Sequence, residues 1–515
     1  MSKYVDLCIE FKLRSGGNIV APGFNPGEIE QKQNRPRAND DKCEDQISDE
    51  IDQIKIKKNN KNTMSKIYDL AIIGGGPAGY VAAERAGAKG MSVLIFDMRS
   101  LGGVCLNEGC IPTKTLLNSA KMLEYAEEAG KYGINVENIS IDFKKIMLRK
   151  DKVVRKLVAG IGAKMKHAKA DVVMAKATIK EKRGEVITIE ADGQEYQANR
   201  LLVCAGSEAA VPPIPGLDAS QILTNREILQ LKEKPESLVI IGGGVIGSEF
   251  ADFFNAMGTK VTVIEMLPEI LTGVDEEIAA FVRKEFVKKG IEFHLNARVT
   301  KLNGKEVVFE KDDQEMKITG DQVLLSVGRK VNATGIGLEN IGVEFTPRGV
   351  KIDQNCRTNV PNVYAAGDIT GFSLLAHTAS REGEVAVNHM LGRKDMMRYD
   401  AIPGVVYTHP EIAGVGLTET AAKEKGIEVE VKQLPMAFAG RFVAENEGKD
   451  GFCKVIVGKK YREILGIHMV GGACSEMIWG ACAIIEAQLR VQDVEEIVFP
   501  HPTVSEIIKE TIFQF

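Results

Sequence analysis

From Ile67 onward the chain carries short hydrophobic runs separated by glycine turns and amphipathic segments. The segments IYDLAII, GGG, PAGYVAAERAGAKG and MSVLIFD predict in turn a strand, a turn, a helix and a second strand. The same order returns in SLVIIGGGVIGSEFADFFNAMGTKVTVIE, which begins at Ser237. The pattern therefore predicts one strand-helix-strand unit that occurs twice, 168 residues apart.

Both units have the spacing G-x-G-x-x-G and an acidic residue at the end of the second strand, 23 residues after the first glycine. A dinucleotide site needs a tight turn, a backbone that the pyrophosphate can approach, a helix N-terminus and a carboxylate for the ribose hydroxyls. Two purely structural glycine turns would not need the acid, so we interpret both units as dinucleotide sites. Their residues are Gly74, Gly76, Gly79 and Asp97 in the first unit, and Gly242, Gly244, Gly247 and Glu265 in the second.

Glu265 also bears on the choice of nicotinamide cofactor. A carboxylate accepts hydrogen bonds from free ribose hydroxyls and repels a 2′-phosphate. No arginine stands in Met266–Glu269 to bind such a phosphate. We therefore expect the second site to prefer NAD over NADP.

Cys105 and Cys110 lie five residues apart in GGVCLNEGCIPTK, between the two units. On a regular helix this separation gives about 7.5 Å of rise, beyond the roughly 7 Å between Cα atoms that a disulfide tolerates. A bridge needs distorted backbone, for which Gly109 and Pro112 are suited, and Pro112 near a helix start would leave Cys110 at the N-terminus, where a thiolate is stabilised. The spacing favours a reactive disulfide, with two buried free cysteines as the alternative.

Residues 1–63 lack both periodicities and hold 11 basic and 11 acidic residues. We therefore expect a solvated, disordered tail over residues 1–65. Translation that starts at Met64 is an equally good explanation of this segment. A small substrate-carrier domain is disfavoured, because the segment has few apolar residues for a core.

Composition narrows the class of protein. Lys plus Arg is 66 and Asp plus Glu is 71, and the net charge of −5 leaves no basic excess for a nucleic-acid partner. No apolar run reaches the ~18 residues of a membrane span, and acids stand where a signal peptide would be apolar. Nine scattered cysteines do not form a secreted disulfide framework, and the histidines lack metal-ligand spacing. We expect a cytoplasmic protein without a membrane, nucleic-acid or metal partner.

Five segments of the chain occur together in one known family. They are GGGPAGY, GGVCLNEGCIPTK, GGGVIGSE, VYAAGDIT and HPTVSE. In this combination the chain resembles the disulfide-reductase flavoenzymes, the class I pyridine nucleotide-disulfide oxidoreductases, and most closely those that oxidise dihydrolipoamide. The resemblance spans Ser65 to Phe515.

The resemblance implies an α/β fold with two Rossmann-like domains, which bind FAD and NAD(P), and a C-terminal α+β dimerisation domain. The expected borders are 66–217 for the FAD-binding domain, 218–340 for the NAD-binding domain, 341–400 for a central domain that continues the FAD-binding one, and 401–515 for the dimerisation domain.

The resemblance also implies that FAD lies at the first glycine turn and NAD at the second. The family more often has Glu at the position of Asp97, whose shorter side chain should still reach a ribose hydroxyl. Further residues that it places beside the cofactors are Lys114, Glu249, Gly328, Gly367 and Asp368 of VYAAGDIT, and Ala376 and His377 of LLAHTA.

By the same resemblance, Cys105 exchanges with the substrate and Cys110 contacts the flavin. His501 and Glu506 match the family's base and the acid that orients it, a pair suited to deprotonating a dithiol near neutral pH. Phe499 stands where relatives often have another histidine.

The expected reaction is oxidation of a protein-bound dihydrolipoyl group by NAD⁺. The expected partners are a second copy of the chain, whose disulfide the histidine loop approaches, and the lipoyl domains of 2-oxo acid dehydrogenase complexes or the glycine cleavage H protein.

Three alternatives are disfavoured. A mercuric reductase would carry an extra C-terminal cysteine pair, which IIKETIFQF lacks, and a glutathione reductase would need basic residues after Glu265. A flavoprotein kept as a structural subunit would not need intact cysteines, a base and both nucleotide motifs.

Overall fold

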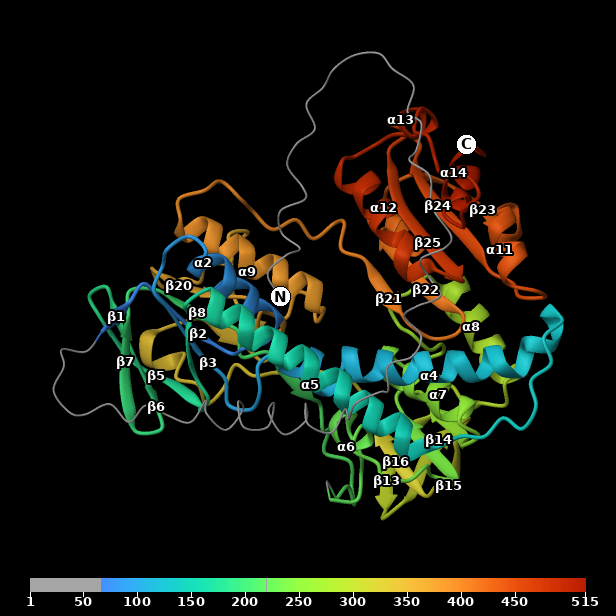
Figure 1. Ribbon diagram of the computed structural model, residues 1–515, viewed down its shortest axis with the longest axis horizontal. Helices are drawn as coiled ribbons and strands as arrows, with labels where there is room; N and C mark the ends of the chain where they lie inside the picture. Colours follow the sequence, from blue (N-terminus) through green and yellow to red (C-terminus); the bar gives the residue numbers. More distant parts are fainter. Residues whose placement is uncertain (1–65, 219) are drawn as a thin grey trace, which may run out of the picture. The chain divides into compact units, whose positions relative to one another are not determined.

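The computed structural model describes residues 66–218 and 220–515 (Figure 1). The tail predicted for residues 1–65 and the alternative start at Met64 lie outside these residues. In the described ranges, no helix is long and apolar enough to cross a membrane.

A five-stranded parallel sheet is the centre of the first unit. In sheet order its strands are β20 (Val363–Ala365), β8 (Leu201–Val203), β2 (Leu70–Ile73), β3 (Val93–Phe96) and β4 (Asp171–Val173). Strands β2 and β3 are buried on both faces, which is why LAII and VLIF are hydrophobic throughout rather than alternating. Helix α2 (Pro77–Gly87) links them and packs beside α9 (Ala376–Met390), as Figure 1 shows.

A four-stranded sheet covers the other face of this parallel sheet. Its strands in order are β1 (Ile67–Tyr68), β7 (Gln194–Ala198), β6 (Val186–Ala191) and β5 (Ala177–Arg183). Successive residues of β2 point to opposite faces. Leu70 and Ile72 therefore pack with the helices, while Ala71 and Ile73 share a core with the four-stranded sheet.

The predicted repeat of the first unit is confirmed by a second parallel sheet. In sheet order its strands are β12 (Glu292–His294), β11 (Lys260–Ile264), β10 (Ser237–Ile241) and β16 (Gln322–Leu325). Helix α7 (Val245–Ala256) links β10 to β11 as α2 links β2 to β3, and α8 (Glu276–Lys288) follows. An antiparallel sheet completes the unit with β13 (Arg298–Asn303), β14 (Glu306–Lys311) and β15 (Gln314–Thr319).

A two-stranded antiparallel ribbon connects the two units. Strand β9 (Ser207–Ala209) leads toward α6 (Asn225–Ile228) and the second unit, and β17 (Arg329–Val331) returns. After the return, Ala333 and Leu338 pack in the core of the first unit. The border expected at residue 340 lies beyond them, and the domain borders stay predictions. The short elements that follow are η3 (Glu339–Ile341), β18 (Phe345–Thr346), β19 (Gly349–Val350) and η4 (Asp368–Thr370).

Helix α4 (Cys110–Glu128) packs on residues of both units. It contacts α5 (Phe143–His167) and α7, and Leu116 shares a core with Phe250 and Phe254 of α7. The hydrophobic face of α4 therefore fixes the start of this helix relative to the second nucleotide unit. The short elements on either side of it are α3 (Gly103–Glu108) and η2 (Ala129–Tyr132).

The C-terminal part is a five-stranded antiparallel sheet with helices packed on it. Its strands in order are β21 (Gly404–Val406), β22 (Glu411–Gly416), β25 (Ile464–Gly471), β24 (Phe452–Gly458) and β23 (Val429–Pro435). The helices are α10 (Glu419–Glu424), η5 (Met436–Phe438), α11 (Gly440–Glu445), α12 (Cys474–Glu486), α13 (Val491–Glu495) and α14 (Glu506–Ile512). The predicted fold class, two α/β units and a C-terminal α+β part, is confirmed.

Gly383→Ala should destabilise the first unit. A Cβ at Gly383 of α9 would lie 2.5 Å from the carbonyl oxygen of Ala78 in α2, so the two helices would have to move apart. We expect unfolding to become easier by about 1–3 kcal/mol, measured by thermal or denaturant unfolding. Gly162→Ala is the matched control, because nothing lies within 4 Å of a Cβ there, and it should leave stability equal or up to about 1 kcal/mol higher. Equal stability of the two variants would contradict the close helix contact.

Candidate active site

The first glycine turn joins β2 to α2 and has the geometry of a phosphate-binding turn. Gly74 has a φ of +108°, and a Cβ there would lie 2.1 Å from the carbonyl oxygen of Cys204. A Cβ at Gly79 would lie 1.9 Å from the oxygen of Gly74, so α2 packs directly on the turn. At Gly76 the nearest atom to a Cβ is Gly103 Cα, 3.8 Å away. Space is thus left at the N-terminus of α2, where a helix binds phosphate.

The second glycine turn repeats this geometry at the start of α7. Gly242 has a φ of +104°, and a Cβ there would lie 2.6 Å from the oxygen of Ser326. A Cβ at Gly247 would lie 2.1 Å from the oxygen of Gly242, whereas one at Gly244 would meet nothing within 4 Å. In both turns the outer glycines are required by close packing, and the middle glycine leaves room for a ligand.

The two strand-end acids hold the backbone of their own turns. Asp97 Oδ2 accepts a hydrogen bond from the Gly75 amide at 2.8 Å, and Glu265 Oε2 accepts one from the Gly243 amide at 2.6 Å. The shorter Asp97 therefore reaches the same main-chain position as its counterpart. A carboxylate has about four acceptor positions. Each acid can thus hold its turn and also accept a ribose hydroxyl, and the two turns fit the FAD and NAD that the resemblance implies.

The Gly367–Asp368 turn is tied to residues that the sequence did not single out. The Gly367 amide donates to Glu382 Oε2 at 2.6 Å, and Asp368 accepts a hydrogen bond from the Ser207 hydroxyl. Arg329 Nε donates to the same Ser207 hydroxyl at 2.7 Å and lies 3.8 Å from Asp368 Oδ2. Ser207 and Arg329 come from the two strands of the ribbon, so the connection between the units also holds this turn.

Burial perturbs two of these side chains. It raises the pKa of Glu382 to about 7, although hydrogen bonds from Tyr399 and the Gly367 amide oppose the rise. It also lowers the pKa of Arg329, against the opposing effect of Asp368. Arg329 directly follows the predicted Gly328, but only the pairing of β9 with β17 brings it to Asp368.

The other predicted cofactor residues occupy turns and a helix start. Gly328 has a φ of +110° and would have nothing within 4 Å of a Cβ. Ala376 and His377 begin α9. Burial lowers the pKa of His377, whose ring is hydrogen-bonded to the backbone of Pro403.

The cysteine pair lies across a break between two helices. Cys105 is in α3, Gly109 has φ −149° and ψ −107°, and Cys110 is the first residue of α4. The backbone distortion expected near Gly109 is confirmed. Both cysteines are free, and the Cys105 thiol donates to the Cys110 sulfur. This hydrogen bond and the Lys114 charge lower the pKa of Cys110 to about 7, while the same hydrogen bond and burial raise the pKa of Cys105.

Lys114 and Glu249 form an ion pair although they lie far apart in sequence. Lys114 Nζ donates to both carboxylate oxygens of Glu249, at 2.8 and 2.7 Å. Glu249 is 3% exposed and also accepts the Tyr407 amide at 3.1 Å. The Lys114 ammonium lies 4.6 Å from the centre of the Tyr407 ring. Lys114 is one turn of α4 beyond Cys110, so this pair sets the charge beside the thiolate.

His501 and Glu506 also contact each other directly. His501 Nδ1 lies 2.9 Å from Glu506 Oε1, and the Thr503 amide donates to Glu506 Oε2 at 2.9 Å. These two contacts lower the pKa of Glu506. The imidazole is 78% exposed, and within residues 66–218 and 220–515 no hydrogen bond or ion pair joins it to the cysteine pair. Within one chain, the predicted base His501 therefore contacts its acid Glu506. The predicted thiols lie beside Lys114, in a separate place.

Two family models match the chain. The pyridine nucleotide-disulphide oxidoreductase model matches residues 68–383, and the dimerisation domain of the same family matches residues 402–512. The first match spans both glycine turns and the cysteine pair, and the second spans the C-terminal sheet and the His501 loop.

Curated relatives match nearly over their whole length. The chain is 37% identical to a dihydrolipoyl dehydrogenase of Bacillus subtilis, over 86% of this chain and 97% of the relative. It is 39% identical to one of Geobacillus stearothermophilus, over 86% and 95%.

Solved structures share the fold. LpdA from Mycobacterium tuberculosis matches with a TM-score of 0.80 at 26% identity, over 86% of this chain and 99% of that one. The HOCl-induced flavoprotein disulfide reductase RclA from Escherichia coli matches with a TM-score of 0.76 at 27% identity, over 87% and 99%. The chain belongs to the pyridine nucleotide-disulphide oxidoreductase family.

Proposed function

We propose that this chain catalyses the dihydrolipoyl dehydrogenase reaction, the oxidation of protein-bound dihydrolipoyl groups by NAD⁺. The observation that carries the proposal is the Cys105–Cys110 pair at the start of α4, with the Lys114–Glu249 ion pair beside it. This arrangement stabilises one thiolate in contact with a second thiol, which a dithiol-disulfide exchange requires. The dihydrolipoyl dehydrogenases of Bacillus and Geobacillus, similar over almost their full length, support the same reaction.

FAD and NAD are the cofactors. We assign FAD to the turn of Gly74, Gly76 and Gly79, where the start of α2 would hold its pyrophosphate and Asp97 its ribose. When bound, FAD would supply the two-electron transfer from the reduced cysteines to NAD⁺. The remaining assigned residues are Gly328, Gly367, Asp368, Ala376 and His377 for FAD, and Gly242, Gly244, Gly247 and Glu265 for NAD.

The thiol chemistry is carried by the two cysteines and by His501, with Glu506 and Lys114 in supporting roles. His501 takes a proton from the dihydrolipoyl dithiol at Nε2, because its Nδ1 is held by Glu506. The thiolate attacks the Cys105 sulfur of the oxidised pair, so a substrate-Cys105 bond forms and the Cys105–Cys110 bond breaks. Cys110 leaves as a thiolate, which the Lys114 ammonium stabilises. The second substrate thiol then attacks the sulfur bonded to Cys105, and its proton goes to the leaving Cys105. The products are an oxidised lipoyl ring, a Cys105 thiol, a Cys110 thiolate and a protonated His501.

A homodimer would complete this site. The His501 ring is largely exposed and its loop belongs to the segment that matches the dimerisation domain. In the same part of the chain, Trp479 is 74% and Val498 is 92% exposed. Removing apolar side chains of this size from water is favourable. A second copy that covers them would bring its own His501 to Cys105 of its partner.

The proposed reaction also indicates which proteins carry the substrate and which compartment suits the enzyme. The lipoyl group is carried by the lipoyl domains of 2-oxo acid dehydrogenase complexes or by the glycine cleavage H protein, which are the partners we propose. A reducing cytoplasm suits a chain whose nine scattered cysteines form no secreted framework. Glu265 favours NAD over NADP at the second turn.

Purified protein with bound FAD should form NADH from NAD⁺ and dihydrolipoamide, followed at 340 nm. With NADP⁺ in place of NAD⁺ the rate should be at least tenfold lower, because the Glu265 carboxylate repels the 2′-phosphate. A protein that holds FAD but does not oxidise dihydrolipoamide would overturn the proposed substrate and leave the fold and cofactor assignments standing.

Cys110→Ser should retain FAD, but its turnover of dihydrolipoamide should fall more than about a hundredfold, because serine cannot form the disulfide. The measurement is the steady-state rate together with the flavin absorbance per chain. Cys482→Ser, at a half-buried cysteine in α12, is the control and should keep both values. Near-normal turnover of Cys110→Ser would contradict the disulfide mechanism.

His501→Gln should slow oxidation of dihydrolipoamide by roughly 10²–10⁴-fold, the usual contribution of a general base. Electron transfer from NADH to a dye does not need that proton transfer and should fall far less. Glu506→Gln should show the same selectivity with a smaller loss, because the imidazole remains but is no longer oriented by a carboxylate. Equal loss in both assays would argue against His501 as the base.

A further inference from the structure

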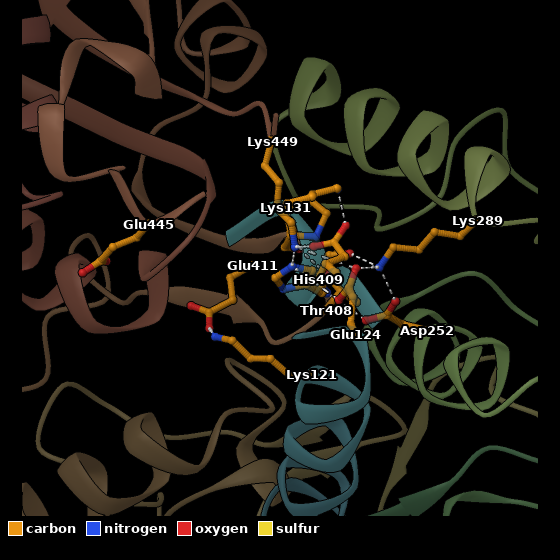
Figure 2. Close-up of polar contacts among 12 residues, drawn as sticks. Lys121, Glu124, Lys131, Asp252, Lys289, Thr408, His409, Glu411, Glu445 and Lys449 are labelled. Carbon is orange, nitrogen blue, oxygen red and sulfur yellow. Dashed lines mark hydrogen bonds and ion pairs between the residues drawn. The ribbon is translucent and has the colours of Figure 1, made fainter. Parts of the chain in front are cut away.

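A cluster of charged side chains joins three parts of the fold away from the cysteines. Figure 2 shows several of its members around His409. This His409 cluster consists of Glu124 and Glu128 of α4, Asp252 of α7, Lys289 just after α8, and His409 and Lys449 of the C-terminal part. The acidic and basic side chains of this cluster are paired with one another. The cluster therefore connects parts of the fold and is not a site for a free ion.

Asp252 is the most buried acid of this cluster. It is 4% exposed, and burial raises its pKa. Its Oδ2 accepts the His409 amide at 2.8 Å, and its Oδ1 accepts Lys289 Nζ at 3.2 Å. Lys289 also donates to the His409 carbonyl oxygen at 2.7 Å (Figure 2). Asp252 and Lys289 therefore hold both backbone polar groups of one residue.

The His409 ring acts as an uncharged acceptor. Burial, reinforced by Lys449, Lys289 and Lys121, lowers its pKa to about 3. Lys449 Nζ lies 2.8 Å from His409 Nε2, and Glu124 Oε2 lies 3.4 Å from the same nitrogen. The ring is thus held by Lys449, which also pairs with Glu128 of α4 at 3.0 Å, and His409 is fixed at its backbone and its side chain.

Residues 407–409 form a strap across α7. Glu249 and Asp252 stand one turn apart on this helix, and they accept the amides of Tyr407 and His409. Thr408 between them is 1% exposed, and its hydroxyl donates to the Pro410 carbonyl oxygen at 2.8 Å. Two backbone hydrogen bonds therefore tie the strap to the Glu249 and Asp252 carboxylates of α7.

The strap is connected to the Cys110 thiolate through Glu249, Tyr407 and Lys114. Glu249 holds Lys114 by two hydrogen bonds, and the Tyr407 ring covers the Lys114 ammonium. A ring face attracts an ammonium group and excludes water from one side of it. Lys114 is thus held beside Cys110 by Glu249 of α7, whose carboxylate also accepts the Tyr407 amide, and by the Tyr407 ring of the strap.

We propose that Asp252 is a positioning residue that, by anchoring the strap 407–409 to α7, holds Glu249 on Lys114 and so keeps the positive charge beside Cys110. This role rests on the proposed function of Cys110 as the thiolate. It is separate from catalysis itself, since Asp252 touches neither cysteine and acts through the strap, Glu249 and Lys114.

The sign of the expected effect follows from the charges around Cys110. The groups that face it are Cys105, Lys114, Glu249 and Arg329, with the Tyr407 phenol nearby. Lys114 lowers the pKa of Cys110 more than Glu249 raises it. If the strap loosens and both groups withdraw, the pKa of Cys110 therefore rises.

The test is the pH dependence of alkylation of Cys110 in the reduced holoenzyme. Iodoacetamide reacts with the thiolate, and fragmentation of the modified peptide separates Cys105 from Cys110. In Asp252→Ala the pKa of Cys110 should rise by about one unit, which slows its alkylation at pH 7 about fivefold. Asp252→Asn keeps one acceptor and the shape of the side chain, so we expect about a twofold change. This variant carries the test if the alanine variant does not fold.

Asp275→Ala is the matched control. Asp275 is also 4% exposed at its side chain and pairs with Lys454 of the C-terminal sheet, with both oxygens at 3.0 Å. It caps α8 by accepting the Ile278 amide, and in the described part of the chain no hydrogen bond or ion pair joins it to Glu249. We expect this variant to lose stability without a change in the pKa of Cys110.

The inference is overturned if Cys110 of Asp252→Ala, with full FAD content, is alkylated at the same rate as Cys110 of the protein without substitutions. It is also overturned if Asp275→Ala shifts the pKa of Cys110 as much as Asp252→Ala does. Because alkylation needs neither dihydrolipoamide nor NAD⁺, failure of the proposed reaction and failure of this inference are measured separately.

Discussion

The ion pair between Lys114 and Glu249 is the contact on which the arrangement of the site depends. It joins the helix that begins with Cys110 to the helix that begins with the second glycine turn. A carboxylate that is 3% exposed is costly to bury unless it is fully paired. Two bonds from Lys114 and one from the Tyr407 amide satisfy it. The same contact therefore fixes the geometry between two nucleotide units and supplies a charge that, together with the hydrogen bond from Cys105, lowers the pKa of Cys110.

Sequence reasoning succeeded where the constraint is local. The outer glycines of each turn could be predicted because a Cβ at Gly79 or Gly247 would overlap a backbone oxygen of its own turn, five residues earlier. The acids Asp97 and Glu265 ended the predicted strands for a related reason, since each holds the amide of its own turn. The break at Gly109 was likewise visible, because two cysteines five residues apart cannot bridge on a regular helix.

Sequence reasoning did not reach the contacts that tertiary structure creates. Arg329 follows a predicted glycine, yet its role at Asp368 exists only because β17 pairs with β9. Glu382 and Asp252 look like ordinary helix-surface acids by composition, and their burial follows from the packing of α9 and α7. Glu249 and Lys114 were found through family resemblance alone, since nothing in the spacing of residues 135 positions apart relates them.

The charged contacts between the parts of the chain carry specificity more than stability. Burying a charge pair gains little over apolar packing, whereas removing one partner costs about 3–5 kcal/mol because the other charge stays buried. Asp252, Asp275 and Glu249 each meet a lysine from a different segment of the chain. A hydrophobic interface tolerates sliding, but these pairs are satisfied only in one register. A site whose thiolate depends on the position of Lys114 beside Cys110 needs that register, and this is a physical reason for the charged contacts that accompany the apolar packing of α7.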